Sequence, residues 1–306
     1  MKVPHPIPYQ GSKRNIAKYI LPFFPRELTT LVEPFAGSAA ISIAAACYGK
    51  SSHFFLNDLN KPLMALWQEI IHNPQGIAAS YERLWKEQQG NEREYYNHVR
   101  DKFNRTQRPD YLLYLLARCV KASVRYNPKG EFNQSPDNRR LGREPQRMAD
   151  DIFAVSNLFR GRTKVTSKDY KDILQSSQSE DLVYLDPPYQ GVCGNGDSRY
   201  YGGVDFEELM HELGKLNRRH VPFILSYDGR TGDKIFGREL PRELGMHRIE
   251  VEAGRSTQST LLGGSDFTYE SVYVSKSLVE RLGVHPHELM RRAVTQKATQ
   301  LELIAR

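Results

Sequence analysis

The sequence predicts an α/β fold in which helices cover an open, mostly parallel sheet. Leu182–Leu185 is an apolar run of strand length that ends abruptly at an acid and two prolines. Residues 31–33 form a second short strand, which leads through a turn of small residues into an Ala- and Ile-rich helix. His53–Asn57 is a third strand. Ligands of such sheets bind beyond the carboxyl ends of the strands, so we expect the site there.

The composition is that of a globular protein without a membrane segment. Of the 306 residues, 39% are hydrophobic and 26% charged, and no apolar run approaches the roughly 20 residues that cross a bilayer. Residues 1–6 lack the apolar core of a secretory signal. The cysteines Cys47, Cys119 and Cys193 show no paired spacing, and His-Pro-His at 285–287 is a poor metal motif. We therefore expect a cytoplasmic protein that binds no membrane and no metal.

Positive charge is concentrated in one part of the chain. The formal net charge is +7, and residues 101–147 alone hold eleven Lys or Arg against five Asp or Glu. Phosphate backbones are the commonest partner of such a basic segment, so the segment predicts nucleic-acid binding. A solvated surface with no partner is the alternative.

The four residues after the 182–185 strand predict chemistry on an exocyclic amine of a nucleobase. Such an amine is a weak nucleophile, because its lone pair is delocalised into the ring, and a protein can activate it by accepting hydrogen bonds from its N–H groups. Asp186 and the Pro187 carbonyl supply two acceptors, and Pro187-Pro188 keeps the backbone extended. Tyr189 offers a flat face for a base turned out of its helix. The alternative is a strand-terminating turn followed by a surface tyrosine.

The first two strands predict a nucleoside cofactor. Gly37 lets the backbone approach a ligand closely, and Phe35 can pack against an apolar part of it. Asp58 follows the second strand about twenty residues later, an arrangement that holds ribose hydroxyls. The turn lacks the full Gly-x-Gly-x-x-Gly pattern, which favours a nucleoside without a pyrophosphate. Lys13, before an expected helix at 15–24, could hold a carboxylate; an ordinary capped helix start is the alternative.

A helical lobe and a basic hairpin follow these strands. Residues 62–124 have helical periodicity, and residues 124–133 indicate a hairpin with its turn at 127–130. Basic and aromatic residues interleave in this hairpin, which favours a finger that enters a DNA groove; an exposed hairpin with no partner is the alternative. A helix at 145–159 should lead back to the core, and the next strand should end near Asp169, a further candidate ligand contact.

The carboxyl-terminal third is predicted in less detail. Residues 191–203 hold five glycines and are a candidate lid. Asp205 indicates the cap of a helix that runs to about residue 219. Residues 248–252 and 270–274 alternate as an antiparallel pair at the sheet edge, and residues from 286 onward form a basic helix.

With these features present in this order, residues 7–275 resemble the Dam-like (D12 class) adenine-N6 DNA methyltransferases. The resemblance implies a Rossmann-like, S-adenosylmethionine-dependent methyltransferase sheet with an inserted, mostly helical DNA-recognition domain. It implies a catalytic domain at 1–60 and 160–280, a recognition insert at 61–159 and a helical extension at 281–306.

The resemblance also assigns roles to individual residues. The catalytic residues are Asp186, Pro187, Pro188 and Tyr189. The cofactor-binding residues are Tyr9, Lys13, Phe35, Ala36, Gly37, Ser38, Asp58, Asp169 and Asp186. The DNA-binding residues are Arg125, Asn127, Lys129, Phe132, Asn133, Arg139 and Arg140. The chain departs from the family at 36–39, where members carry a more glycine-rich turn, and at Gln10, where some carry an aromatic residue.

The expected function is site-specific methyl transfer from S-adenosylmethionine to N6 of a flipped-out adenine in double-stranded DNA. Transfer to cytosine N4 or to adenine in RNA stays open, as does a non-catalytic nucleic-acid binder with the same fold. The expected protein is a monomer or weak dimer, and a cognate restriction endonuclease acting separately is a further partner left open.

Overall fold

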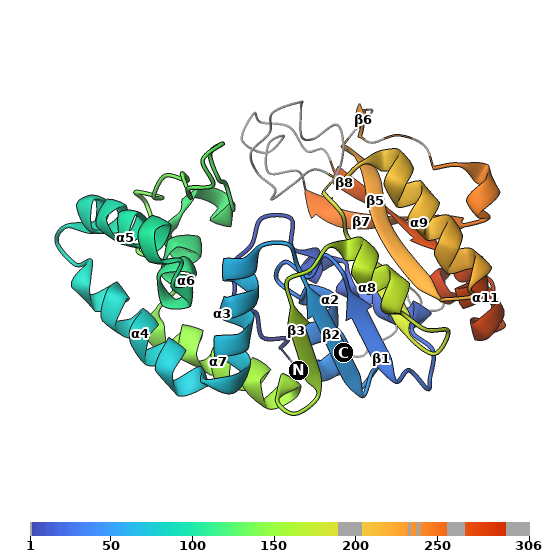
Figure 1. Ribbon diagram of the computed structural model, residues 1–306, viewed down its shortest axis with the longest axis horizontal. Helices are drawn as coiled ribbons and strands as arrows, with labels where there is room; N and C mark the ends of the chain where they lie inside the picture. The colour runs from blue at the N-terminus through green and yellow to red at the C-terminus, as the bar shows by residue number, and fades with distance from the viewer. Residues whose placement is uncertain are drawn as a thin grey trace, which may run out of the picture.

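The computed structural model describes residues 2–188, 204–231, 234–236, 238, 240–255 and 267–291. These residues form one eight-stranded sheet of order β3-β2-β1-β4-β5-β8-β7, with β6 paired to β5 (Figure 1). The strands are β1 Thr30–Glu33, β2 His53–Asn57, β3 Thr163–Thr166, β4 Leu182–Leu185, β5 Phe223–Thr231, β6 Lys234–Phe236, β7 His247–Arg255 and β8 Phe267–Val274. The first five in chain order are parallel, whereas β8 runs antiparallel to both β5 and β7. The α/β prediction is confirmed.

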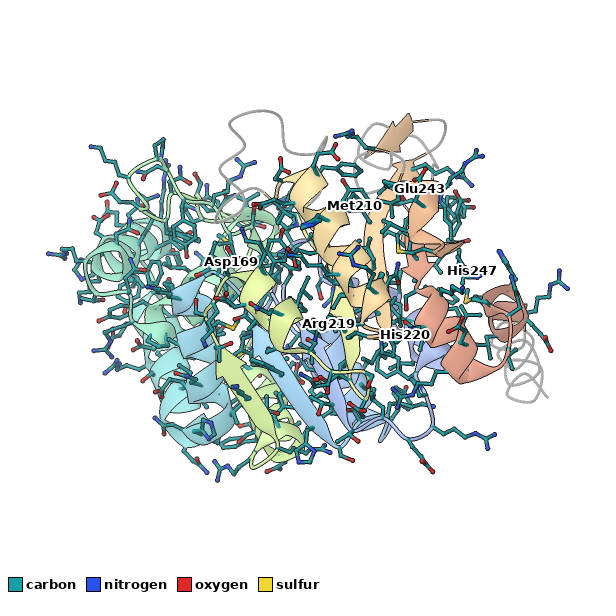
Figure 2. The ribbon with its side chains drawn as sticks, turned by 45° about the vertical axis from the view of Figure 1, so that its right-hand side comes forward. Asp169, Met210, Arg219, His220, Glu243 and His247 are labelled. Atoms are coloured by element: carbon teal, nitrogen blue, oxygen red, sulfur yellow. The ribbon has the colours of Figure 1, made fainter. Side chains whose placement is uncertain are left out.

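Successive side chains of the central strands point to opposite sides of the sheet, and the side chains on both sides are buried. On β1 and β4, Leu31 and Leu182 join one apolar cluster, while Val32 and Val183 join a second cluster on the other face. Helices α8 (Tyr170–Ser176) and α9 (Phe206–Arg218) cover this second face, and Arg219 links them by donating to the Leu174 carbonyl at 3.1 Å (Figure 2). A near-continuous apolar run such as β4 is the sequence pattern of a strand covered on both sides.

The helices follow the strands in the order that the sequence indicates. They are α1 Ala17–Ile20, α2 Ala40–Cys47, α3 Lys61–His72, α4 Pro74–Glu87, α5 Glu92–Thr106, α6 Pro109–Arg118, α7 Pro145–Phe159, α8 Tyr170–Ser176, α9 Phe206–Arg218 and α11 Lys276–Leu282. The chain between β2 and β3 contains α3 to α7, and α4, α5 and α6 lie to one side of the sheet in Figure 1. No helix among the described residues has the length and apolarity needed to cross a bilayer.

Several local expectations are confirmed. The helix expected at 145–159 is α7. Asp205 caps α9 by accepting from the Glu208 N–H at 2.9 Å. Strands β7 and β8 form the expected antiparallel pair.

The prediction of one continuous helix at 15–24 is wrong. The segment forms three short helical turns, Lys13–Asn15, Ala17–Ile20 and Leu21–Phe23. Pro22 lacks the N–H donor that would continue the α-helix, so α1 ends at Ile20 and a single 3-10 turn follows. The apolar face was assigned correctly, since Ile16 and Ile20 are buried.

Other expectations lie outside the described residues. Tyr189, the glycine-rich segment 191–203 and residues 292–306 belong to this group. Residues 286–291 are helical, which agrees with the start of the expected basic helix.

Candidate active site

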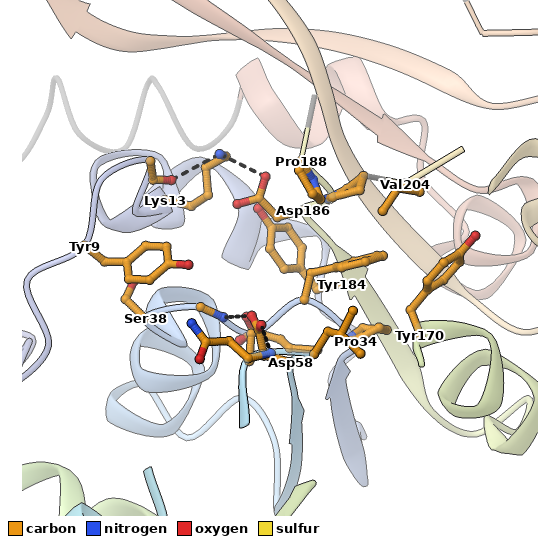
Figure 3. Close-up of a pocket in the computed structure, with 18 of the residues that line it drawn as sticks. Tyr9, Lys13, Pro34, Ser38, Asp58, Tyr170, Tyr184, Asp186, Pro188 and Val204 are labelled. Carbon is orange, nitrogen blue, oxygen red and sulfur yellow. Dashed lines mark hydrogen bonds and ion pairs between the residues drawn. The ribbon is translucent and has the colours of Figure 1, made fainter. Parts of the chain in front are cut away.

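A cavity of about 430 Å³ opens at the carboxyl ends of β1, β2 and β4 (Figure 3). Its volume is within the usual range of small-ligand sites. Among its lining residues are all the predicted cofactor and catalytic residues that the structure describes: Tyr9, Lys13, Phe35, Ala36, Gly37, Ser38, Asp58, Asp169, Asp186, Pro187 and Pro188. Segments far apart in the sequence therefore meet here, because parallel strands end at the same edge of the sheet.

The turn after β1 is fixed from two sides. Gly37 has φ +48°, and a Cβ added there would lie 3.2 Å from the Tyr9 ring. Trp67 of α3 donates from Nε1 to the Gly37 carbonyl at 2.9 Å. Ser38 Oγ donates to Ser12 Oγ at 2.9 Å. Glycine adopts this conformation without strain, and the backbone of the turn is held both by α3 and by the amino-terminal loop.

Asp58 accepts a backbone hydrogen bond at each carboxylate oxygen. Oδ2 accepts from the Gly37 N–H and Oδ1 from the Asn60 N–H, both at 3.0 Å. The carboxylate therefore connects the end of β2 to the β1 turn and still faces the cavity (Figure 3).

Asn57, the last residue of β2, was not predicted from the sequence. It is fully buried, and its Nδ2 donates to the carbonyls of Pro34 and Lys168 at 3.0 Å. Its Oδ1 accepts from Thr166 Oγ1 at 2.8 Å and from the Lys168 N–H at 2.9 Å. One side chain thus joins the carboxyl ends of β1, β2 and β3. A polar amide ending a buried strand is a signal that could have identified it.

Lys13 is a buried cation beside Asp186. Its Nζ lies 2.9 Å from Asp186 Oδ1, 3.6 Å from Glu270 Oε2, and donates to the Gly11 carbonyl at 3.2 Å. Burial lowers the pKa of Lys13, but the carboxylates of Asp186 and Glu270 outweigh burial and raise the pKa above its ordinary value. The ammonium is therefore charged throughout the physiological range. Glu270 was not predicted from the sequence.

An aromatic wall forms the other end of the cavity. The rings of Phe35 and Tyr170 lie 5.1 Å apart at 34°. The Tyr170 hydroxyl is buried and has no hydrogen-bond partner among the described residues. Asp169 caps α8 by accepting from the Lys171 N–H at 2.9 Å. Tyr170 was missed because nothing in the sequence around it differs from an ordinary helix start.

Glu33 is a buried acid at the end of β1, on the wall of the same cavity. It is 2% exposed, and its Oε1 accepts from the Ser42 N–H at 2.6 Å. Burial raises the pKa of this carboxyl to about 8, although its hydrogen bonds to Ser42 act in the opposite direction. Glu33 is therefore mostly protonated at neutral pH.

The pKa of Glu33 predicts how stability depends on pH. The folded protein retains this proton up to about pH 8, whereas the unfolded chain loses it near 4.5, so folding is progressively opposed as pH rises through this window. Glu33→Gln should therefore raise the free energy of unfolding at pH 9 by roughly 1–5 kcal/mol relative to wild type, with little difference at pH 4. Urea unfolding at pH 4, 7 and 9 measures this. A difference that does not change with pH contradicts the assignment.

The basic hairpin has the predicted turn. The Asn127 N–H donates to the Glu131 carbonyl and the Gly130 N–H to the Asn127 carbonyl, both at 2.8 Å. Tyr126 and Phe132 form an antiparallel β-bridge on either side of the turn. Asn127 is half-buried at the turn. The side chains of Arg125, Lys129, Asn133, Arg139 and Arg140 are exposed.

The role predicted for Phe132 needs correction, and one of the eleven basic residues in 101–147 is not at the surface. The Phe132 ring is 1% exposed and packs edge-on against Phe103 and Tyr126, both with ring centroids 5.9 Å away. A hairpin needs one apolar face to hold it on its lobe, so Phe132 anchors the hairpin and presents no face for stacking on a base. Arg118 is buried and bonded to Gln88, so its charge is not available at the surface.

The sheet order and the cavity at its carboxyl edge are those of a Rossmann-like methyltransferase fold. The model of the D12 class N6 adenine-specific DNA methyltransferase family matches residues 9–257, and the chain belongs to this family. The resemblance stated from the sequence is thereby confirmed.

The chain is similar to several named methylases. A DNA N-6-adenine-methyltransferase of Escherichia phage P1 is 24% identical over 81% of this chain and 32% of its own length. Modification methylase StsI of Streptococcus sanguinis is 23% identical over 89% of this chain and 43% of its own length. The chain thus spans less than half the length of each of these two relatives. The retron Ec67 DNA adenine methylase of Escherichia coli is 29% identical over 82% of this chain and 87% of its own length.

Proposed function

We propose that this chain transfers a methyl group from S-adenosylmethionine to N6 of an adenine turned out of double-stranded DNA at a specific sequence. Family membership and the names of the relatives support this proposal. The observation that carries it is that Asp186, 2.9 Å from Lys13, borders the same cavity as Gly37 and Asp58. The acceptors for an amine and the residues proposed to hold a nucleoside then line one cavity.

The lining of the cavity fits S-adenosylmethionine. The Gly37 backbone leaves room where a Cβ would crowd Tyr9, and Asp58 faces the space with an acceptor for ribose hydroxyls. Phe35 and Tyr170 supply an aromatic wall on which a flat ring can pack. When bound, the cofactor supplies an electrophilic methyl group whose bond to sulfur breaks during the transfer.

The residues of the chain orient the amine and accept its hydrogen bonds. Asp186 and the Pro187 carbonyl accept N–H groups of the amine, which directs the nitrogen lone pair at the methyl carbon. Lys13 keeps Asp186 ionised through their 2.9 Å contact. The nitrogen forms one bond to the methyl carbon, and one of its two N–H protons passes to solvent water. Such positioning of two bound reactants can supply about 7–11 kcal/mol of the barrier. Tyr189 remains the proposed stacking residue.

The helical lobe is the proposed DNA-recognition insert. We assign residues 61–159 to it, residues 1–60 and 160–280 to the catalytic domain and residues 281–306 to a terminal extension. The exposed Arg125, Lys129, Arg139 and Arg140 support this division, because phosphate contacts dominate the affinity of DNA-binding proteins.

Among the described residues no cluster of three His, Cys, Asp or Glu could hold a metal ion.

Lys129 at the tip of the hairpin should contact a phosphate. Lys129→Ala should then weaken binding to all duplexes by a similar factor and reduce the slope of log K against log salt by about 1. Fluorescence anisotropy at several salt concentrations measures both. Lys276→Ala on α11, an exposed lysine of the same kind, is the matched control. An unchanged slope for Lys129→Ala would remove this residue from the interface.

Nucleoside analysis tests the function directly. Duplex DNA and RNA are incubated in separate reactions with the protein and tritiated S-adenosylmethionine, and the DNA should yield labelled N6-methyladenine. Labelled N4-methylcytosine, label found only in RNA, or cofactor binding without transfer would favour one of the alternatives. Sequencing of the modified positions then gives the recognition sequence.

A further inference from the structure

A second carboxylate, Glu270, lies beside the Lys13–Asp186 pair. Glu270 Oε2 is 3.6 Å from Lys13 Nζ, and this oxygen is buried without a hydrogen-bond partner among the described residues. The Glu270 side chain is 21% exposed and borders the cavity, as does Asp186. A buried carboxylate without hydrogen bonds is costly, and the only compensation that the structure assigns to this oxygen within the described residues is the Lys13 charge.

The sheet places Glu270 at the reactive edge. Strand β8 runs antiparallel to β5, so residues near its start lie where the parallel strands end. The register of this pair shifts between Ser226 and Gly229, and Gly229 then stands opposite Glu270. A Cβ on Gly229 would lie 2.5 Å from the Tyr269 carbonyl oxygen, so only glycine permits this close approach of β5 to β8. The backbone irregularity and the acid thus occur at the same level of the sheet.

We propose that Glu270 is a positioning residue for the methyl transfer proposed above, on which this inference rests. It holds the Lys13 ammonium between two carboxylates. A buried ammonium with Asp186 as its single acidic partner would draw that carboxylate toward itself and compete with the amine for its oxygens. By taking up part of the ammonium's attraction, Glu270 leaves the Asp186 carboxylate directed at the amine.

The contact can be tested without any enzyme activity. In protein labelled at the lysine ¹³Cε, the Lys13 signal is assigned by its loss in Lys13→Arg. Glu270→Gln, which keeps the shape and removes the charge, should shift this signal. Glu252→Gln, an exposed acid on neighbouring β7, should leave it in place. An unchanged Lys13 signal in Glu270→Gln overturns the proposal, whether or not the protein methylates DNA.

A double-mutant cycle tests the consequence for catalysis. Glu270→Gln should lower kcat by about 10–10²-fold, the effect of a small misplacement of a reacting group, with KM for the cofactor within about twofold of wild type. In a Lys13→Gln background the same change should have almost no further effect, because Glu270 acts through Lys13. Equal effects in both backgrounds overturn the proposal. If the wild-type protein transfers no methyl group to adenine, the proposed function is contradicted. The Lys13 signal in Glu270→Gln then tests the contact between Glu270 and Lys13 by itself.

Discussion

Asp186→Ala should abolish methyl transfer while leaving DNA binding largely intact. The change removes the carboxylate that orients the amine, and loss of one preorganised electrostatic partner of a reacting group costs about 10²–10³-fold or more in kcat. The fold should persist, because Lys13 retains Glu270 at 3.6 Å and its bond to the Gly11 carbonyl. A tritiated-methyl assay measures transfer, and fluorescence anisotropy measures DNA binding.

Asp181→Ala is the matched control, since Asp181 immediately precedes β4 whereas Asp186 immediately follows it. Its Oδ2 accepts from the Gln178 N–H at 2.8 Å, away from the cavity, so its loss should cost about 1 kcal/mol of stability and no activity. Retained activity in Asp186→Ala would remove Asp186 from its proposed role. Loss of activity in both variants would point to misfolding, which thermal unfolding would reveal.

Asp58→Asn should weaken binding of S-adenosylmethionine by about 10–10²-fold, since hydrogen bonds to a charged group contribute roughly 1.5–3 kcal/mol. The amide of asparagine has one acceptor oxygen, whereas the carboxylate accepts from both the Gly37 and the Asn60 N–H groups. An amide NH₂ would therefore face one of these donors. The β1 turn would lose part of its support together with the proposed ribose contact. Isothermal titration calorimetry measures the affinity.

Asp172→Asn provides the comparison for Asp58→Asn. Asp172 is an exposed acid in the first turn of α8 and does not line the cavity. Its replacement should leave cofactor affinity unchanged and account for any effect of net charge alone. Wild-type affinity in Asp58→Asn would mean that this carboxylate supports the turn without contacting the cofactor.

The amino-acid sequence by itself determined the local features of this protein. Strand and helix periods identified β1, β2, β4 and α7, because alternation and helical spacing are properties of neighbouring residues. Because parallel sheets bind their ligands at the carboxyl ends of the strands, the sequence predicts that Gly37, Asp58 and Asp186 lie together, and all three line one cavity.

The tertiary structure alone decided which side chains complete the site. Glu270 reaches Lys13 across more than 250 residues of sequence, through a strand that runs antiparallel to its neighbour, and no local pattern indicates that contact. Asn57 joins three strand ends, and Phe132 turned inward because its hairpin must bury one face on the helical lobe. Periodicity shows which residues are apolar, but burial and partnership depend on which segments pack together, and packing is a property of the whole chain.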